Sequence, residues 1–144
     1  MFQDWYRNRR QDVTGWFKDL HRHPEVGFEE TRTSAFVAQR LRDMGLEPVT
    51  GIAGTGVVAT LHGAKGKGRT IGLRAELDAL PMTEDSGLPY ASTIRGCAHG
   101  CGHDGHTTTL LATAAYLSEH PDLFGSVRFI FQPAEELLPG AATM

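Results

Sequence analysis

Residues 104–131, DGHTTTLLATAAYLSEHPDLFGSVRFIF, decide the fold class, because a helical pattern changes there into a strand pattern. Leucine and alanine recur three and four residues apart between Leu110 and Leu117, which predicts a helix from Asp104 to near Pro121. The short apolar run 127–131 predicts a strand. A helix that leads directly into a strand is typical of α/β proteins.

Two further helices are predicted nearer the N-terminus. Asp4 is a suitable N-cap for a helix that reaches about His21, with apolar residues on one face. A second pattern runs from about Glu29 to Met44 and ends at Gly45, a residue that often terminates helices. We expect both helices to pack on a sheet.

The strands of that sheet are predicted from short apolar runs. Val57–Leu61 and Thr70–Leu77 are separated by a connection rich in glycine and lysine, which predicts a β-hairpin. The fold class is therefore α/β, with helices packed on a mixed β-sheet. A long irregular segment is predicted between Pro81 and Gly102, and such segments often line functional sites.

Composition excludes several classes of protein. The chain has 144 residues, a formal net charge of −3, 40% hydrophobic residues and 22% charged residues, which are values of an ordinary globular domain. Intrinsic disorder and a disulfide scaffold are excluded. The slightly acidic balance lacks the positive field that nucleic-acid binding requires, so no nucleic-acid partner is expected.

The predicted location is the cytoplasm, with no membrane partner. No apolar run has the length of a signal peptide or a membrane span. The two cysteines, Cys97 and Cys101, have three residues between them, whereas thioredoxin-like redox pairs have two. Cys101 is flanked by histidines, which favours metal chemistry over a disulfide.

The densest group of candidate ligands lies in residues 99–106, which hold His99, Cys101, His103 and His106. Gly102 would let Cys101 and His103 turn toward one ion, because glycine adopts backbone angles that other residues avoid. Thiolate and imidazole together suit a transition metal. The alternative is a loop of solvated histidines beside a buried cysteine. His106 is as well placed to bind a backbone carbonyl as a metal.

Glu135 and Glu136 follow the last predicted strand, where ligands gather in open α/β sheets. One carboxylate could bind a cation while the other accepts a proton from water. Glutamate pairs in loops are usually only solvated, so the interpretation depends on the neighbouring cysteine and histidine cluster.

Glu76 and Asp78 lie two apart at a predicted strand and should share one face. Buried carboxylates need partners, which could be metal ions or Arg74 on the same face. Both alternatives remain open at this stage. His21 and His23, beside Pro24, fit a plain role at the end of a helix.

Four motifs occur in order: LHRHPE (20–25), RAELDALP (74–81), HGCGHDGH (99–106) and FQPAEE (131–136). With these motifs the sequence resembles the metal-dependent amidohydrolases of the hippurate hydrolase, N-acyl-amino-acid amidohydrolase and auxin-conjugate hydrolase group, which are relatives of aminoacylases and glutamate carboxypeptidases. The resemblance implies a zinc-peptidase-like three-layer sandwich. It also implies hydrolysis of the amide bond of small N-acyl amino acids.

The resemblance further implies a role for five residues. Cys101, His103 and Glu136 match metal ligands, Glu135 matches the general base that activates water, and Asp78 matches a supporting carboxylate. The implied centre holds two divalent ions, commonly zinc, manganese, cobalt or nickel. The family often has aspartate where Glu76 stands and alanine where Gly100 stands.

Members of that family are much longer, and two further histidine ligands and an inserted dimerisation domain lie beyond the glutamate pair. We therefore expect residues 1–144 to be the N-terminal portion of a catalytic domain, with an incomplete metal site and no inserted domain. No helix is predicted after the last strand, so one face of the sheet should be uncovered and prone to self-association.

The competing hypothesis is a non-catalytic module in which a cluster of cysteines and histidines holds a structural zinc ion. Its four ligands would be Cys97, His99, Cys101 and His103. They fall within seven residues, which is more crowded than the ligand pairs of ordinary zinc fingers.

Overall fold

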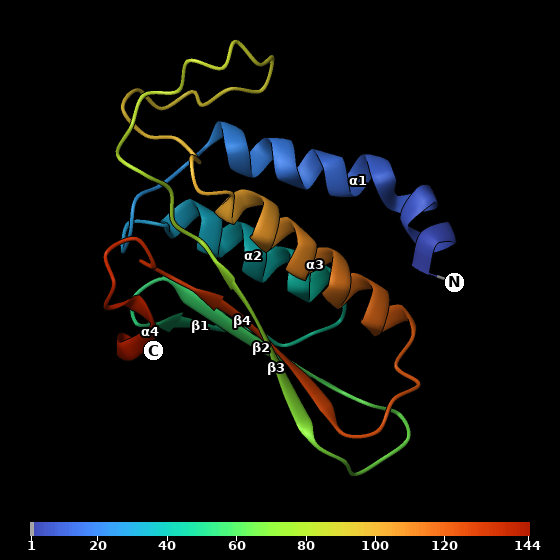
Figure 1. Ribbon diagram of the computed structural model, residues 1–144. Helices are drawn as coiled ribbons and strands as arrows, with labels where there is room; N and C mark the ends of the chain where they lie inside the picture. Colours follow the sequence, from blue (N-terminus) through green and yellow to red (C-terminus); the bar gives the residue numbers. More distant parts are fainter. Residues whose placement is uncertain (1) are drawn as a thin grey trace.

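The computed structural model describes residues 2–144, in which three long helices lie on one side of a four-stranded sheet (Figure 1). In chain order the elements are α1 (Phe2–Arg22), α2 (Thr31–Asp43), β1 (Val49–Ile52), β2 (Gly56–His62), β3 (Thr70–Glu76), α3 (His103–Glu119), β4 (Ser126–Gln132) and the short α4 (Gly140–Thr143). The predicted α/β class with helices on a mixed sheet is confirmed.

The strand order is β1-β2-β4-β3, with β4 antiparallel to β2 and parallel to β3. The predicted hairpin between residues 57–61 and 70–77 is therefore wrong, because β4 lies between these two strands. The connection between them instead bonds to the segment that leads into β4. Gly63 donates to the carbonyl of Gly125, and Gly125 donates to the carbonyl of Gly66, both at 2.8 Å.

A hairpin does occur one element earlier in the chain. β1 pairs with β2 in antiparallel fashion, with Val49 opposite Val58. Sequence patterns did not predict β1, whose four residues are mostly exposed and show no apolar alternation. The sheet thus begins with a short edge strand that precedes the predicted ones.

The core lies between the sheet and the pair α2 and α3. Alternate side chains of β4 point into it, and Phe129 and Phe131 are completely buried. The alternation follows from strand geometry, in which successive side chains face opposite sides. The other large side chains of this core that are at most 1% exposed are those of Val37, Leu41, Val57, Leu77 and Leu111.

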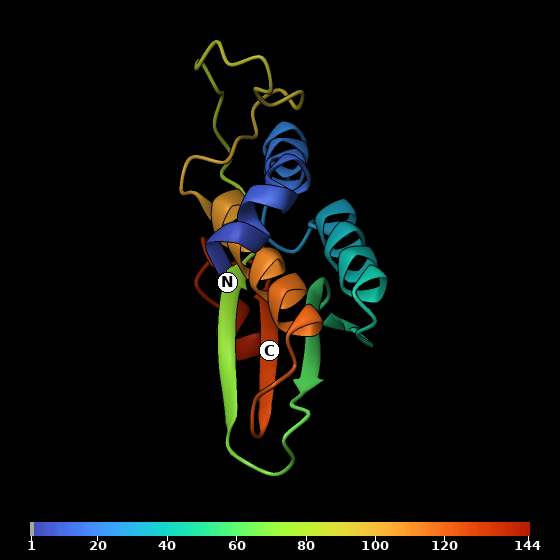
Figure 2. The ribbon, with the colours of Figure 1, turned by 90° about the vertical axis from the view of Figure 1, so that its right-hand side faces the viewer.

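Helix α1 packs on α3 rather than on the sheet, so the prediction that it would lie on the sheet is wrong (Figure 2). The rings of Trp5 and Tyr116 meet edge to face with centroids 5.6 Å apart, and the Trp5 indole donates to Glu119 at 2.9 Å. Asp4 lies inside the first helical turn and not at the N-cap, because the helix begins at Phe2.

The three long helices share one side of the sheet, as both views show (Figures 1 and 2). The opposite face presents apolar and polar side chains. Val58 lies opposite Ile130 there, and Thr60 lies opposite Arg128, to which it is joined by a hydrogen bond of 3.3 Å. A second layer of long helices, expected for a three-layer sandwich, is not found within residues 2–144. Across the same residues, no helix combines the length and the apolar character needed to cross a membrane.

Candidate metal centre

The predicted site residues gather at one edge of the sheet. Because β3 and β4 are parallel, their carboxyl ends lie side by side, which brings Asp78 near Glu135 and Glu136. Helix α3 begins at the same edge with His103, so the Cys101 loop reaches the glutamate pair. Open α/β sheets generally bind ligands at this end of their strands.

Three of these residues form a compact group of potential ligands. The Cys101 sulfur, a ring nitrogen of His103 and a carboxylate oxygen of Glu136 all lie within 4.8 Å of one another. Gly102 has a φ of +87° just before α3, so the chain turns between Cys101 and His103 as its glycine predicts.

His103 is oriented by Asp78. Its Nδ1 lies 2.8 Å from the backbone carbonyl of Asp78 and 3.2 Å from the Asp78 carboxylate. A carbonyl oxygen can only accept, so Nδ1 carries a hydrogen and Nε2 is the nitrogen on the side away from Asp78. Nε2 faces the glutamate pair, 3.7 Å from Glu135 and 3.9 Å from Glu136. This is the arrangement by which outer carboxylates and carbonyls orient histidine ligands.

The charges around His103 also affect its proton. Burial lowers the pKa of His103, but the hydrogen bonds from its ring to Asp78 and the negative charges of Asp78 and Glu76 outweigh burial and raise it to about 9. Without a cation, the imidazole therefore holds a proton among the carboxylates. A metal ion at this point would replace that positive charge.

Asp78 is 1% exposed and connects the two sides of the site. Its Oδ2 accepts the backbone N–H of Glu136 at 2.9 Å. Burial raises the pKa of Asp78, but the hydrogen bonds from His103 and from the backbone of Glu136 and Glu135 outweigh burial. The pKa of Asp78 therefore lies below its usual value. Asp78 stays ionised and supports both His103 and the glutamate pair.

The local chemistry fits a transition metal. One oxygen of Glu136, Oε1, is buried and has no hydrogen-bond partner among the described residues. A hydrogen bond to Glu136 raises the pKa of the Cys101 thiol, and a cation bound between the two side chains would favour the thiolate instead. Thiolate, imidazole and carboxylate form a suitable ligand set for zinc and related ions.

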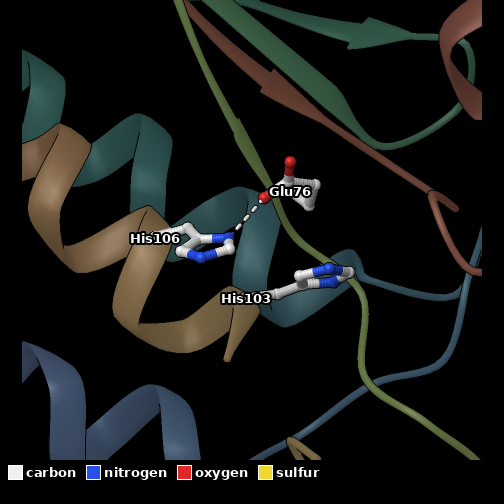
Figure 3. A group of neighbouring side chains, drawn as sticks. All are labelled: Glu76, His103 and His106. Carbon is white, nitrogen blue, oxygen red and sulfur yellow. Dashed lines mark hydrogen bonds and ion pairs between the residues drawn. The ribbon is translucent and has the colours of Figure 1, made fainter. Parts of the chain in front are cut away.

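A second group, Glu76, His103 and His106, also brings ligand atoms within 4.8 Å (Figure 3). Glu76 pairs with His106 at 2.7 Å and with Arg74 at 2.6 Å, so both carboxylate oxygens have partners. Of the two alternatives left open for Glu76 and Asp78, Arg74 therefore applies to Glu76, whereas Asp78 is held by His103. His106 bonds to Glu76 and not to a backbone carbonyl.

The four-ligand zinc cluster of the competing hypothesis is not assembled. Both groups of potential ligands found within residues 2–144 contain His103, and neither contains Cys97 or His99. Cys97 is a buried free thiol whose pKa is raised by burial. Burial likewise lowers the pKa of His99, to about 4. The structure supports no structural zinc site with this ligand set.

Sequence patterns missed two residues beside the site. The sequence predicts a plain role at a helix end for both His21 and His23, which holds for His23 but not for His21. The His21 ring lies 2.6 Å from Asp104, which opens α3, and 3.2 Å from Glu84 in the irregular segment. The partners of His21 lie 83 and 63 residues away in the chain, so no local pattern could reveal them. The second missed residue is Glu30, which is completely buried.

The His21 contacts predict a pH effect on stability. Burial lowers the pKa of His21, but bonds to Asp104 and Glu84 raise it above 6.5. The resulting stabilisation is complete below pH 6.5 and is lost as the pH rises through the higher pKa of the folded state. The free energy of unfolding lost on His21→Asn should therefore shrink between pH 6 and pH 9, as measured by urea denaturation.

Glu84→Gln provides the control for this effect. It removes one of the two acids that raise the pKa of His21, so the pH dependence should become weaker but keep its sign. A loss on His21→Asn that stays constant or grows with pH would contradict the assigned ion pairs.

The comparisons with known proteins agree with this geometry. The family model for "Peptidase family M20/M25/M40" matches residues 72–144, which include every residue of the ligand groups. The structure superimposes on a Bacillus subtilis protein described as a dinuclear metal binding peptidase from the M20 family, with a TM-score of 0.91 and 39% identity. That match covers 95% of this chain and 38% of the other.

Relatives with sequence similarity include two amidohydrolases. The chain is 43% identical to an N-acyl-L-amino acid amidohydrolase of Geobacillus stearothermophilus and 46% identical to a hippurate hydrolase of Campylobacter jejuni. Each match covers 92% of this chain but only 36% and 35% of the relative. The chain thus spans about a third of the length of these enzymes.

A further relative has a different name. The chain is 48% identical over 127 residues to a putative glutamate–cysteine ligase of Rhodococcus jostii. That match covers 88% of this chain but only 16% of the other protein, so most of that protein lies outside the shared segment. The family match, the fold and the ligand geometry agree with one another. The chain belongs to peptidase family M20/M25/M40.

Proposed function

We propose that this chain carries part of the metal site and the general base of an enzyme that hydrolyses the amide bond of N-acyl amino acids. The observation that carries the proposal is the group formed by Cys101, His103 and Glu136, with the Glu135 carboxylate beside it. The names of the two amidohydrolase relatives support this class of substrate.

The proposed ligands are Cys101, His103 and Glu136, with His103 binding through Nε2. Glu135 lies outside that group and its side chain is 40% exposed, so it remains free to exchange protons. Asp78 positions both sides of the site through His103 and the Glu136 backbone. A bound divalent ion would lower the pKa of water and polarise the amide carbonyl.

The proposed reaction uses one carboxylate twice. Glu135 accepts a proton from water as the water oxygen bonds to the amide carbon. It then delivers that proton to the amide nitrogen as the carbon–nitrogen bond breaks. The products are a carboxylic acid and a free amino acid, and Glu135 returns to its ionised form.

Residues 1–144 would then form the N-terminal portion of the catalytic domain, without the inserted dimerisation domain. A dinuclear site would need more donors than three side chains, because each ion usually takes four or more. We propose that other parts of the enzyme supply them, with zinc, manganese, cobalt or nickel as the ions. The open face of the sheet is the proposed surface for self-association.

Metal content tests the site. We expect the chain, purified without chelator and dialysed against Zn²⁺, to retain the ion by elemental analysis. Cys101→Ser and Glu136→Gln should each lower the affinity, because each removes one of three ligands. Cys97→Ser is the matched control, since this buried thiol belongs to neither ligand group.

The reverse pattern would refute the proposed site. Metal lost on Cys97→Ser but kept on Glu136→Gln would favour the structural zinc module instead. A wild-type chain that binds no ion would refute a site preassembled in these residues.

A further inference from the structure

Glu30 is an acidic side chain in an unexpected place. It precedes α2 and is completely buried. Its Oε1 accepts the backbone N–H of Ala134 at 2.8 Å, and its Oε2 accepts the hydroxyl hydrogen of Thr55 at 2.6 Å. Within residues 2–144, no lysine or arginine forms an ion pair with it.

Such a carboxylate is costly to bury. Removing an ion from water costs several kcal/mol even after the protein relaxes, and an apolar side chain of similar size often gives equal or greater stability. Packing alone therefore does not account for an acid at this position. The two hydrogen bonds that it accepts indicate what it does.

One of these bonds holds a strained residue. Ala134 has a φ of +50°, in the left-handed region that residues with a side chain rarely adopt. It is completely buried, and it packs against Gly27, where an added Cβ would lie only 3.0 Å from the Ala134 Cα and Cβ. Gly27 thus leaves room for Ala134, and Glu30 accepts the hydrogen bond from its backbone N–H.

Ala134 immediately precedes the glutamate pair. On the other side of Glu135, the backbone N–H of Glu136 is held by Asp78 at 2.9 Å. The turn that carries Glu135 is thus held at both ends by hydrogen bonds to buried carboxylates, Glu30 before it and Asp78 after it. Asp78 also orients His103, so its hydrogen bond to the turn belongs to the site already described.

We propose that Glu30 is a positioning residue that sets the backbone of the Glu135–Glu136 turn, so that Glu136 meets Cys101 and His103. The proposal rests on the proposed function of the site. The hydroxyl of Thr55, in the turn between β1 and β2, holds the second oxygen of Glu30 and keeps the carboxylate aimed at Ala134.

Glu30→Met tests the proposal. Methionine has a similar length but accepts no strong hydrogen bond, so the Ala134 N–H loses its partner. Amide exchange at Ala134, measured by NMR, should accelerate about tenfold or more, because a hydrogen bond to a charged group is lost. Affinity for Zn²⁺, measured by competition titration, should fall about 10- to 100-fold, as when other supporting residues are removed.

Three further variants make the result specific. Glu30→Gln keeps an oxygen for Ala134 and can donate to Thr55, so it should restore most of the affinity. Thr55→Val should give a smaller loss of the same kind, and it decides the question if Glu30→Met does not fold. Glu25→Met is the matched control, because Glu25 accepts the N–H groups of Arg32 and Thr33 at the start of α2 and does not contact Ala134.

The expected pattern is lower Zn²⁺ affinity with Glu30→Met and Thr55→Val, and near wild-type affinity with Glu30→Gln and Glu25→Met. Unchanged exchange at Ala134 in Glu30→Met would overturn the proposal, as would an equal loss of affinity in Glu25→Met. A wild-type chain without Zn²⁺ affinity would refute the proposed function alone, because exchange at Ala134 still decides the role of Glu30.

Discussion

Replacing Glu135 with glutamine is expected to lower the rate of hydrolysis of an N-acyl amino acid such as hippurate by about 10²- to 10⁴-fold, the usual contribution of general acid–base catalysis. Glutamine keeps the size of the side chain but cannot accept the proton from water. The measurement is the initial rate of amino acid release by the metal-loaded protein.

The same variant should leave metal binding nearly intact. Glu135 is not in the group formed by Cys101, His103 and Glu136, so Zn²⁺ affinity should stay close to that of the wild type. Glu136→Gln is the contrasting variant, which should lose metal and activity together. Full activity in Glu135→Gln would show that another group accepts the proton.

Phe129→Ala is expected to lower the free energy of unfolding by about 3–5 kcal/mol, the range for large aromatic residues in a packed core. Phe129 is completely buried in β4, the strand that pairs with both β2 and β3. Removing its ring leaves a cavity between the sheet and α3. Urea denaturation, followed by circular dichroism, measures the change.

Phe124→Ala is the matched control for this prediction. Phe124 lies just before β4 and is 67% exposed, so the same substitution should change stability by less than about 0.5 kcal/mol. Similar losses in the two variants would contradict the assigned core.

Much of the site could be predicted from sequence because its residues lie in short motifs. Cys101 and His103 are separated only by Gly102, and Glu135 and Glu136 are adjacent, so their proximity required no knowledge of the fold. That the two motifs meet was implied by the resemblance to a known family, because the pairing of β3 with β4 was not predicted from the strand patterns. The resemblance to a known family supplied the roles, which the experiments above test.

Strand pairing was harder to predict, because periodicity shows which face of an element is apolar but not which element covers it. Residues 57–61 and 70–77 are both apolar and close in sequence, which favoured a direct hairpin. The actual neighbour of both is β4, which lies about fifty residues further along the chain. The same ambiguity placed α1 on the sheet instead of on α3.

The supporting residues gave no sequence signal. Glu30 lies among the other acids of residues 25–30 and looks like part of a solvated surface. Its partner Ala134 is 104 residues away in the chain. Because the residue with the positive φ is an alanine and not a glycine, the sequence does not indicate that its backbone is strained. Only the folded chain shows that this acid is buried.

The central place of β4 also determines the order in which the sheet can be made during synthesis. β2 and β3 are both translated before their shared neighbour, and β4 starts 50 positions after the last residue of β3. At about 5–20 residues per second, this delay lasts roughly 3–10 s. Throughout that interval the edges of β2 and β3 that β4 later joins have no strand partner in the nascent chain.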